Sequence, residues 1–149
     1  MITAGSALDR LTAGNQRFVD GNLKSEILAS PERRNKLIGK QKPFAVILGC
    51  SDSRVPCEIV FDHGLGDLFV IRVAGNIAAQ SQIGSVEYAV ENFGCPLVVV
   101  LGHSGCGAIR ACFNHLRQSR DTPTENLRAI VDRIRPSIQA LLEPGQAED

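Results

Sequence analysis

The side chains best suited to catalysis lie in two short segments of this sequence. These are Cys50-Ser51-Asp52-Ser53-Arg54 and His103-Ser104-Gly105-Cys106-Gly107. Two cysteines and a histidine, with H-x-x-C spacing in the second segment, are the thiolate and imidazole ligands that zinc takes in tetrahedral geometry. Catalytic zinc sites use three protein ligands and leave one position open. The sequence therefore predicts a Zn2+ ion held by Cys50, His103 and Cys106.

A carboxylate and a guanidinium stand close to the first of these ligands. Arg54 could hold Asp52 ionised and oriented through a forked pair of hydrogen bonds. Asp52 could then accept a hydrogen bond from zinc-bound water or hydroxide, because zinc can bring the pKa of that water to about 7. Hydroxide attack on carbon dioxide gives bicarbonate. The pattern thus favours a zinc enzyme that hydrates carbon dioxide reversibly, with Asp52 and Arg54 as catalytic residues.

Other interpretations of the same residues are open. Asp52 could bind zinc as a fourth ligand, which would close the site or make the zinc purely structural. Asp52 and Arg54 could also form an ordinary salt bridge. A redox cysteine pair is disfavoured because the sequence has no C-x-x-C. Cys57, Cys95 and Cys112 have no partner at ligand spacing, so we expect them to be buried as small apolar side chains.

Three short apolar runs explain how the two segments could meet. Residues 44–48, 68–73 and 96–101 contain the aliphatic side chains typical of strands buried on both faces of a parallel sheet. The first run ends just before Cys50, and the third just before His103. Open α/β sheets place their sites at the carboxyl ends of such strands. If these two strands are neighbours, the predicted ligands converge in one crevice.

Helical periodicity predicts the elements that flank this sheet. Residues 81–93 join the second and third strands as a right-handed crossover. Further helices are expected at residues 6–20 with Ser6 as N-cap, at 25–40, at 106–117, and at 124–142 with a kink at Pro136. We therefore expect one α/β domain over residues 1–149, with a central, mostly parallel β-sheet flanked by helices. An N-terminal helical arm would occupy residues 1–40, and the core residues 44–142.

The composition argues against several classes of function. Of the 149 residues, 44% are hydrophobic, and 16 basic residues balance 16 acidic ones, so no charge excess points to nucleic acid or an anionic membrane. No apolar run approaches the roughly 20 residues that span a bilayer, and the amino terminus does not resemble a signal peptide. We accordingly expect a cytoplasmic protein without nucleic-acid or membrane partners. In a reducing compartment, its five cysteines favour metal ligands or free thiols over disulfides.

Four further stretches accompany the two segments described first. They are Leu11-Thr12-Ala13-Gly14-Asn15-Gln16-Arg17-Phe18, Val55-Pro56, Phe61-Asp62-His63-Gly64-Leu65-Gly66-Asp67-Leu68-Phe69 and Arg72-Val73-Ala74-Gly75-Asn76. Taken together, these motifs resemble the beta-class carbonic anhydrases. The resemblance implies zinc on Cys50, His103 and Cys106, and a catalytic dyad of Asp52 with Arg54. It also implies a homodimer or a multiple of dimers, with the site near the subunit interface and amino-terminal helices around the partner.

Two departures from that family bear on the predicted site. His63 stands where family members commonly carry glutamine in the substrate pocket, and it could bind substrate, shuttle protons near neutral pH or fill space. Together with His63, Gly105 is predicted to contact substrate. Family chains usually continue past the last predicted helix, so we expect a sheet edge that is exposed or paired with another subunit. The alternative functions are a zinc-dependent hydrolase of carbon disulfide or carbonyl sulfide, and a non-catalytic zinc-binding assembly module.

Overall fold

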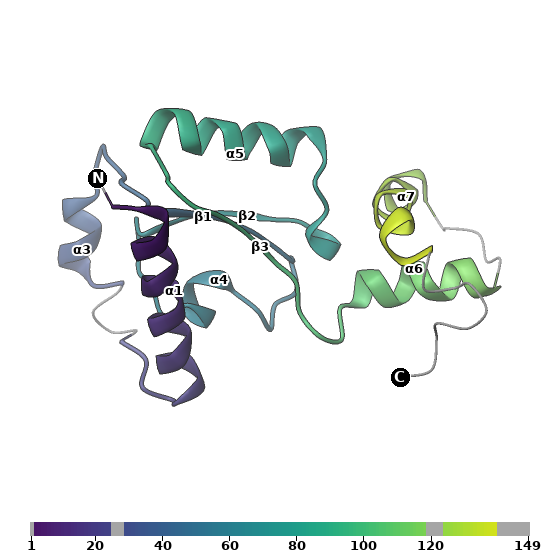
Figure 1. The fold of residues 1–149 in the computed structure, drawn as a ribbon, viewed down its shortest axis with the longest axis horizontal. Coiled ribbons are helices and arrows are strands. Elements are labelled where there is room, and N and C mark those ends of the chain that lie inside the picture. Colours follow the sequence, from purple (N-terminus) through teal and green to yellow (C-terminus); the bar gives the residue numbers. More distant parts are fainter. Residues whose placement is uncertain (1, 25–28, 119–123, 140–149) are drawn as a thin grey trace.

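A parallel β-sheet lies at the centre of the molecule (Figure 1). The computed structural model describes residues 2–24, 29–118 and 124–139. The strands are β1 (Ala45–Gly49), β2 (Leu68–Arg72) and β3 (Val98–Leu101), in the order β2-β1-β3. Both ladders are parallel. The predicted α/β architecture is therefore confirmed, and the first and third predicted strands are neighbours.

β1 is the most deeply buried element, since all five of its residues are buried. It lies between the other two strands, so both of its backbone edges are hydrogen-bonded. Side chains alternate across a strand, and Ala45 and Ile47 accordingly enter one core while Val46 and Leu48 enter the other. A continuous apolar run suits this position because helices cover both faces of the strand.

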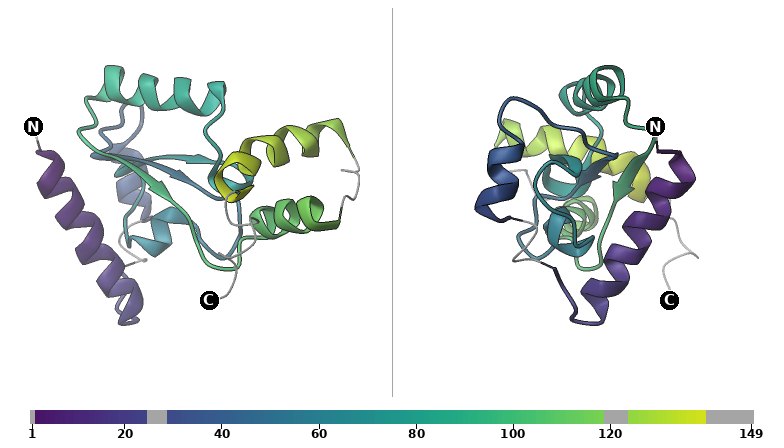
Figure 2. Two further views of the ribbon diagram at one scale, coloured as in Figure 1. Left: turned by 45° about the vertical axis from the view of Figure 1, so that its right-hand side comes forward. Right: turned by 90° about the vertical axis from the view of Figure 1, so that its left-hand side faces the viewer.

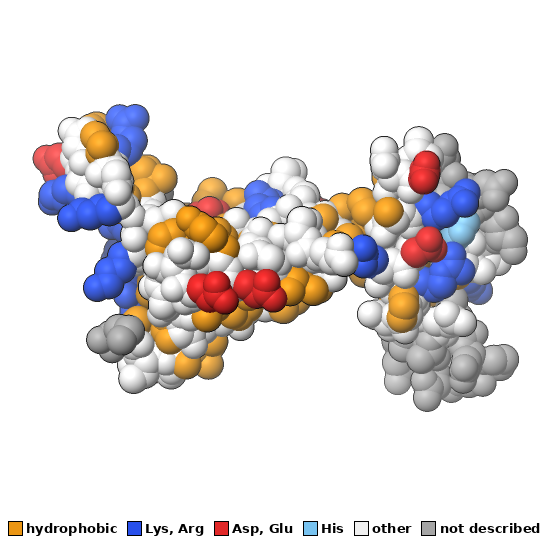
Figure 3. Space-filling view, turned by 90° about the horizontal axis from the view of Figure 1, so that it is seen from above, with side chains coloured by type: hydrophobic (Ala, Val, Ile, Leu, Met, Phe, Trp, Pro, Cys, Tyr) orange, Lys and Arg blue, Asp and Glu red, His pale blue; other side chains and the backbone are white. Residues whose placement is uncertain are grey.

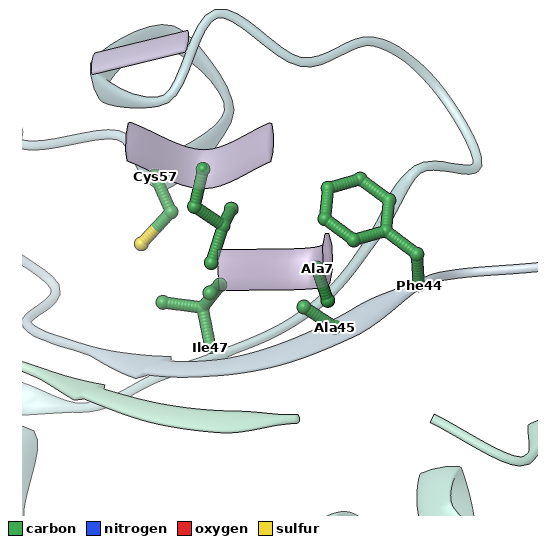
Figure 4. Packing of buried hydrophobic residues seen from close by; sticks show 6 residues of the cluster. Ala7, Phe44, Ala45, Ile47 and Cys57 are labelled. Carbon is green, nitrogen blue, oxygen red and sulfur yellow. The ribbon is translucent and has the colours of Figure 1, made fainter. Parts of the chain in front are cut away.

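The helices α1 (Ala4–Val19) and α4 (Cys57–Val60) lie over one face of the sheet. The buried cluster between them and the strands consists of Ala7, Leu11, Phe44, Ala45, Ile47 and Cys57 (Figure 4). Ala7 and Leu11 are one helical turn apart, and both are almost inaccessible to solvent. The first predicted helix therefore packs into the same core as the strands of its own chain.

The opposite face is covered by α5 (Gln80–Phe93). The connection from β2 to β3 runs through the 3-10 turn Ala74–Asn76 and then through α5. Its start and end agree with the predicted crossover helix to within one residue. Gly94 ends the helix in the left-handed conformation, with φ of 63°, which glycine adopts without steric cost. The buried cluster on this face consists of Val46, Leu48, Ile71, Ala89 and Cys95.

The prediction that every strand is buried on both faces is wrong for β3. Val98 and Val100 are 42% and 62% exposed. The register pairs them with Val46 and Leu48, so they face the same side of the sheet as α5. That helix packs over β1 and β2 and leaves this face of β3 uncovered. Among the described residues, the outer edge of β3 has no strand beside it, as expected for a free sheet edge.

The last two described helices, α6 (Gly107–Gln118) and α7 (Glu125–Gln139), form a hairpin that stands beside the sheet (Figure 2). They have a buried cluster of their own, made by Cys112, Val131, Ile134 and Ile138. Viewed from the α5 side, the hairpin forms a separate bulge that carries many charged side chains (Figure 3). α7 continues through Pro136, and the last predicted helical residues, 140–142, lie outside the described residues. No described helix has the length and apolarity needed to cross a membrane.

The amino-terminal helices begin at positions that differ from the prediction. Thr3, not Ser6, is the N-cap of α1, because the Thr3 hydroxyl accepts a hydrogen bond from the Ser6 N–H. In place of a helix over 25–40, the structure has the short α3 (Pro31–Lys36), and residues 25–28 are not described. Ser30 caps α3, and proline suits its first turn because the N–H groups there have no helical partner.

Candidate metal centre

The carboxyl ends of β1 and β3 bring the predicted metal ligands together. Cys50 follows β1 directly, and His103 comes two residues after the end of the adjacent β3. Cys106 precedes the first residue of α6, and its carbonyl accepts the hydrogen bond that opens that helix. The three side chains therefore converge because their strands are neighbours and the H-x-x-C segment turns back into a helix.

The three ligand atoms form a compact cluster that fits a metal ion. The Cys50 and Cys106 sulfurs and a ring nitrogen of His103 all lie within 4.8 Å of one another, and the two sulfurs are 3.9 Å apart. The His103 Nε2 atom is buried and has no hydrogen-bond partner among the described residues. Its Nδ1 atom lies 3.0 Å from the Ser104 carbonyl, and a proton there would leave Nε2 as a lone-pair donor. An N/S donor set of this kind suits zinc.

The surroundings of Cys50 favour its thiolate. Burial by itself would raise the pKa of Cys50, but the backbone N–H groups of Asp52 and Gly75 and the nearby His103 side chain lower the pKa to about 7. The interaction with Cys50 in turn raises the pKa of His103. A thiolate is the form in which cysteine binds metal, so these surroundings would prepare Cys50 to act as a ligand.

Asp52 and Arg54 form a forked ion pair beside the cluster. Arg54 donates through Nε to Asp52 Oδ1 at 2.9 Å and through a terminal nitrogen to Oδ2 at 2.7 Å. The Arg54 backbone N–H also donates to Oδ1, at 3.0 Å. These hydrogen bonds hold the pKa of Asp52 far below its usual range, so the carboxylate is ionised at neutral pH. Asp52 Oδ2 lies 3.9 Å from His103 Nε2, at the rim of the metal cluster.

Known proteins are similar to this chain in sequence and in fold. The profile of the carbonic anhydrase family matches residues 45–149, which include all three predicted ligands. The chain belongs to the beta-class carbonic anhydrase family. Carbonic anhydrase from Mycolicibacterium smegmatis is 46% identical over 133 residues, covering 89% of this chain and 64% of that protein. Carbonic anhydrase 2 from Mycobacterium tuberculosis is 44% identical, covering 89% of this chain and 63% of its own length.

Solved structures give the same family assignment. The beta-carbonic anhydrase CcaA superposes with a TM-score of 0.66 at 28% identity, over 97% of this chain and 65% of that one. The Coccomyxa beta-carbonic anhydrase in complex with acetazolamide gives a TM-score of 0.64 at 27% identity, over 95% of this chain and 63% of that one. The chain thus spans just under two thirds of the length of the relatives it matches.

Gly105, predicted to contact substrate, lies in the turn of this family's H-x-x-C segment. Its φ of 66° is in the left-handed region, and no atom beyond its chain neighbours would lie within 4 Å of an added Cβ. Its carbonyl accepts a hydrogen bond from Arg54 at 3.2 Å. Arg54 therefore ties the two ligand segments to each other, while the outer side of Gly105 stays open.

His63 lies away from the metal cluster of its own chain. Its Nε2 atom is 3.3 Å from the Arg10 carbonyl, its Nδ1 atom is 3.7 Å from an Asp67 oxygen, and its ring meets Phe44 edge-on. The hollow that it lines, of about 290 Å3, contains none of the predicted ligands. The structure therefore does not bring His63 together with Cys50 or Asp52 within one chain.

Sequence reasoning missed two contributors to the centre, Arg72 and Gly75. Arg72 donates to the carbonyls of Cys50 and Asp52, and the Gly75 N–H contacts the Cys50 sulfur. Both residues lie in Arg72-Val73-Ala74-Gly75-Asn76, one of the stretches that resemble the family. A charged residue near the carboxyl end of the second predicted strand was the available signal for Arg72, but the sequence did not show which strand lies beside it.

The remaining cysteines take no part in the centre. Cys57, Cys95 and Cys112 are buried in three different clusters, as predicted. Burial raises the pKa of each of these thiols. They therefore stay protonated at neutral pH and behave as small apolar side chains.

Proposed function

We propose that this chain catalyses the zinc-dependent, reversible hydration of carbon dioxide to bicarbonate and a proton. The observation that carries the proposal is the buried, unpartnered Nε2 of His103 within a Cys50–His103–Cys106 cluster, next to a carboxylate that Arg54 holds ionised. Membership of the carbonic anhydrase family supports the same reaction. When bound by these three residues, zinc would lower the pKa of water so that hydroxide is available near neutral pH.

The proposed role of Asp52 is to orient the nucleophile. An ionised carboxylate can only accept hydrogen bonds. Asp52 would therefore accept a hydrogen bond from the attacking group, which would leave a lone pair of that group directed at the carbon atom of carbon dioxide. Arg54 keeps Asp52 in this state, because it donates to both carboxylate oxygens and to the Gly105 carbonyl. Binding of Asp52 as a fourth ligand, the alternative, would require these hydrogen bonds to rearrange. The observed ion pair supports the open arrangement.

The expected dimer and the role of His63 belong to the same proposal. Since His63 contacts Arg10, Phe44 and Asp67 in its own chain, a substrate contact would have to come from the His63 of a second copy. A homodimer, or a multiple of dimers, with the metal centre near the interface would allow this. Gly105 is proposed to border the substrate through the open side of its turn. A cytoplasmic location stays a prediction.

The decisive experiment is to measure carbon dioxide hydration and zinc content on the same samples of wild type and Asp52→Asn. We expect the variant to retain equimolar zinc and to lose at least about 100-fold in kcat, in the range of positioned proton acceptors. Asp9→Asn, an exposed position on α1, is the matched control and should behave as wild type. Full activity of Asp52→Asn with zinc bound would reject the proposed role of Asp52.

The same assay separates the alternative functions. Zinc-loaded, folded wild type that shows no hydration above background between about pH 6 and 9 would favour the non-catalytic zinc-binding module over the proposed enzyme. Rates measured side by side with carbon disulfide and carbonyl sulfide would show whether either is the preferred substrate. Activity should fall toward acidic pH as the bound hydroxide is protonated, and only a fall steeper than a single titrating group gives would indicate that Asp52 also enters the metal's open position.

A further inference from the structure

We propose that Arg72 is a positioning residue of the metal centre, which fixes the backbone between the ligand Cys50 and the carboxylate Asp52. The inference rests on the proposed zinc site but does not require the proposed reaction. Arg72 touches neither the ligand atoms nor the carboxylate directly. It acts through the backbone carbonyl groups of Cys50 and Asp52, the two residues on either side of Ser51.

The contacts of Arg72 are short and converge on one segment. Its Nε atom donates to the Cys50 carbonyl at 2.9 Å, and a terminal nitrogen donates to the Asp52 carbonyl at 2.6 Å. Donors from a charged group make stronger hydrogen bonds than neutral donors. One guanidinium therefore holds two peptide groups at a fixed separation, and with them the directions in which the Cys50 and Asp52 side chains leave the chain.

The sheet register explains why an arginine can do this from β2. Arg72 is the last residue of β2 and pairs with Gly49, the last residue of β1. Beyond that pair the ladder continues for one more step, where the Ser51 N–H donates to the Val73 carbonyl at 3.3 Å. After this step the segment leaves the sheet, so its carbonyl groups need hydrogen-bond donors other than the backbone of β2. The Arg72 guanidinium supplies these donors to Cys50 and Asp52.

The fork complements the role of Arg54. Arg54 binds the Asp52 carboxylate and the Gly105 carbonyl, on the side of the H-x-x-C segment. Arg72 binds the main chain of the Cys50 segment from the side of β2. The two arginines thus orient Asp52 at both of its ends. Groups that orient metal ligands from outside the ligand set typically change metal affinity or activity by about 10–100-fold when they are removed.

Binding two carbonyl groups at once requires a side chain with two donors in a fixed arrangement, which a single charged nitrogen does not provide. Lysine carries its positive charge on one nitrogen at the end of a flexible chain, whereas arginine presents donors in a rigid plane. Arg72→Lys would keep the charge and could reach one carbonyl at a time. Arg72→Gln would remove the charge and leave one amide group as donor. Comparison of the two variants therefore separates forked positioning from a general effect of positive charge.

The experiment measures zinc affinity by chelator competition, the absorption spectrum of the cobalt-substituted protein, and kcat and KM for carbon dioxide. The variants are Arg72→Gln and Arg72→Lys, with Arg128→Gln on the exposed surface of α7 as a control that loses the same charge. We expect Arg72→Gln to bind zinc about 10–100-fold more weakly, to shift the cobalt bands, and to lose kcat rather than KM. Arg72→Lys should recover only part of the loss, and Arg128→Gln should match wild type.

Unfolding of the metal-free proteins shows whether the loss is local. Similar melting temperatures for Arg72→Gln and Arg128→Gln, together with a lower zinc affinity of Arg72→Gln alone, would support positioning. Wild-type affinity and an unchanged cobalt spectrum in Arg72→Gln would overturn it, and so would full recovery in Arg72→Lys. If wild type binds zinc but does not hydrate carbon dioxide, the proposed function fails while the zinc and cobalt measurements still decide the role of Arg72.

Discussion

Asp62 shows how a single buried residue can connect distant parts of this chain. Its carboxylate is only 1% exposed, and it accepts hydrogen bonds from the Arg17 side chain of α1 and from the Lys24 N–H. Burial alone would raise the pKa of Asp62, but these partners lower it below its usual value. Its φ of 48° is in the left-handed region, which aspartate and asparagine tolerate better than most residues. Asp62 thereby secures α1 to the loop that carries His63.

Asp62→Asn tests this connection with little change in shape, since asparagine fits the same backbone conformation. We expect it to lower the free energy of unfolding by about 2 kcal/mol at neutral pH, as for a hydrogen bond to a charged group. The folded pKa lies below the unfolded value of about 3.9, so the contribution is complete above that value and is lost as the pH falls through the folded pKa. Urea unfolding from about pH 7 down to pH 3 should show the variant and wild type converging, whereas a constant difference would contradict the charge-based account.

At the scale of elements, the strands differ in how completely neighbouring strands and helices cover them. β1 has a strand on each side and a helical layer on each face, whereas β3 has its α5-facing side exposed at Val98 and Val100. Both strands are apolar in sequence. Equal hydrophobicity therefore does not translate into equal contributions to stability.

Substitutions in β1 and β3 should show this difference. Ile47→Ala removes a fully buried side chain at the centre of the sheet and should cost about 3–4 kcal/mol of unfolding free energy, the transfer and cavity terms combined. Val100→Thr keeps a β-branched side chain at a position that is 62% exposed, so it should change stability by less than about 0.5 kcal/mol. Chemical denaturation of the monomeric or dimeric protein at one fixed concentration measures both. A loss above about 1.5 kcal/mol for Val100→Thr would mean that another subunit covers β3.

At the scale of the whole molecule, the candidate metal centre lies where the sheet meets the hairpin. Cys50 and His103 belong to the ends of strands, while Cys106 opens α6, whose partner α7 forms a separate buried cluster with it. The hairpin also contacts the turn at Ala74–Asn76 that follows β2. An ion bound by all three ligands would therefore hold the two parts of the molecule together.

Zinc binding should accordingly stabilise the fold. Because an ion that binds only the folded state adds RT ln(1 + [L]/Kd), free zinc at 100 times Kd should add about 2.7 kcal/mol. Thermal unfolding with added zinc and with a chelator measures the shift in melting temperature. Cys106→Ser, which weakens the ligand set, should lose most of this shift, and an equal shift in that variant would indicate that zinc binds elsewhere.

The sequence by itself was enough to predict the Cys50–His103–Cys106 cluster, the Asp52–Arg54 pair and the strands that precede them. Cysteine and histidine at the ends of apolar runs are local signals, since strand ends and ligand chemistry depend on neighbouring residues in the chain. The cap at Thr3 and the short α3 were also readable locally, because Thr3 and Ser30-Pro31 are N-terminal helix signals that our prediction overlooked.

Only the tertiary structure decided the exposure of β3, the placement of His63 and the contacts of Arg72. An apolar strand looks the same in sequence whether or not a helix covers it, and here α5 packs mainly over β1 and β2. His63 contacts the Arg10 carbonyl, 53 positions away, and Arg72 contacts the Cys50 and Asp52 carbonyls, 22 and 20 positions away. Such contacts depend on how elements far apart in the sequence pack against one another, which no local pattern encodes.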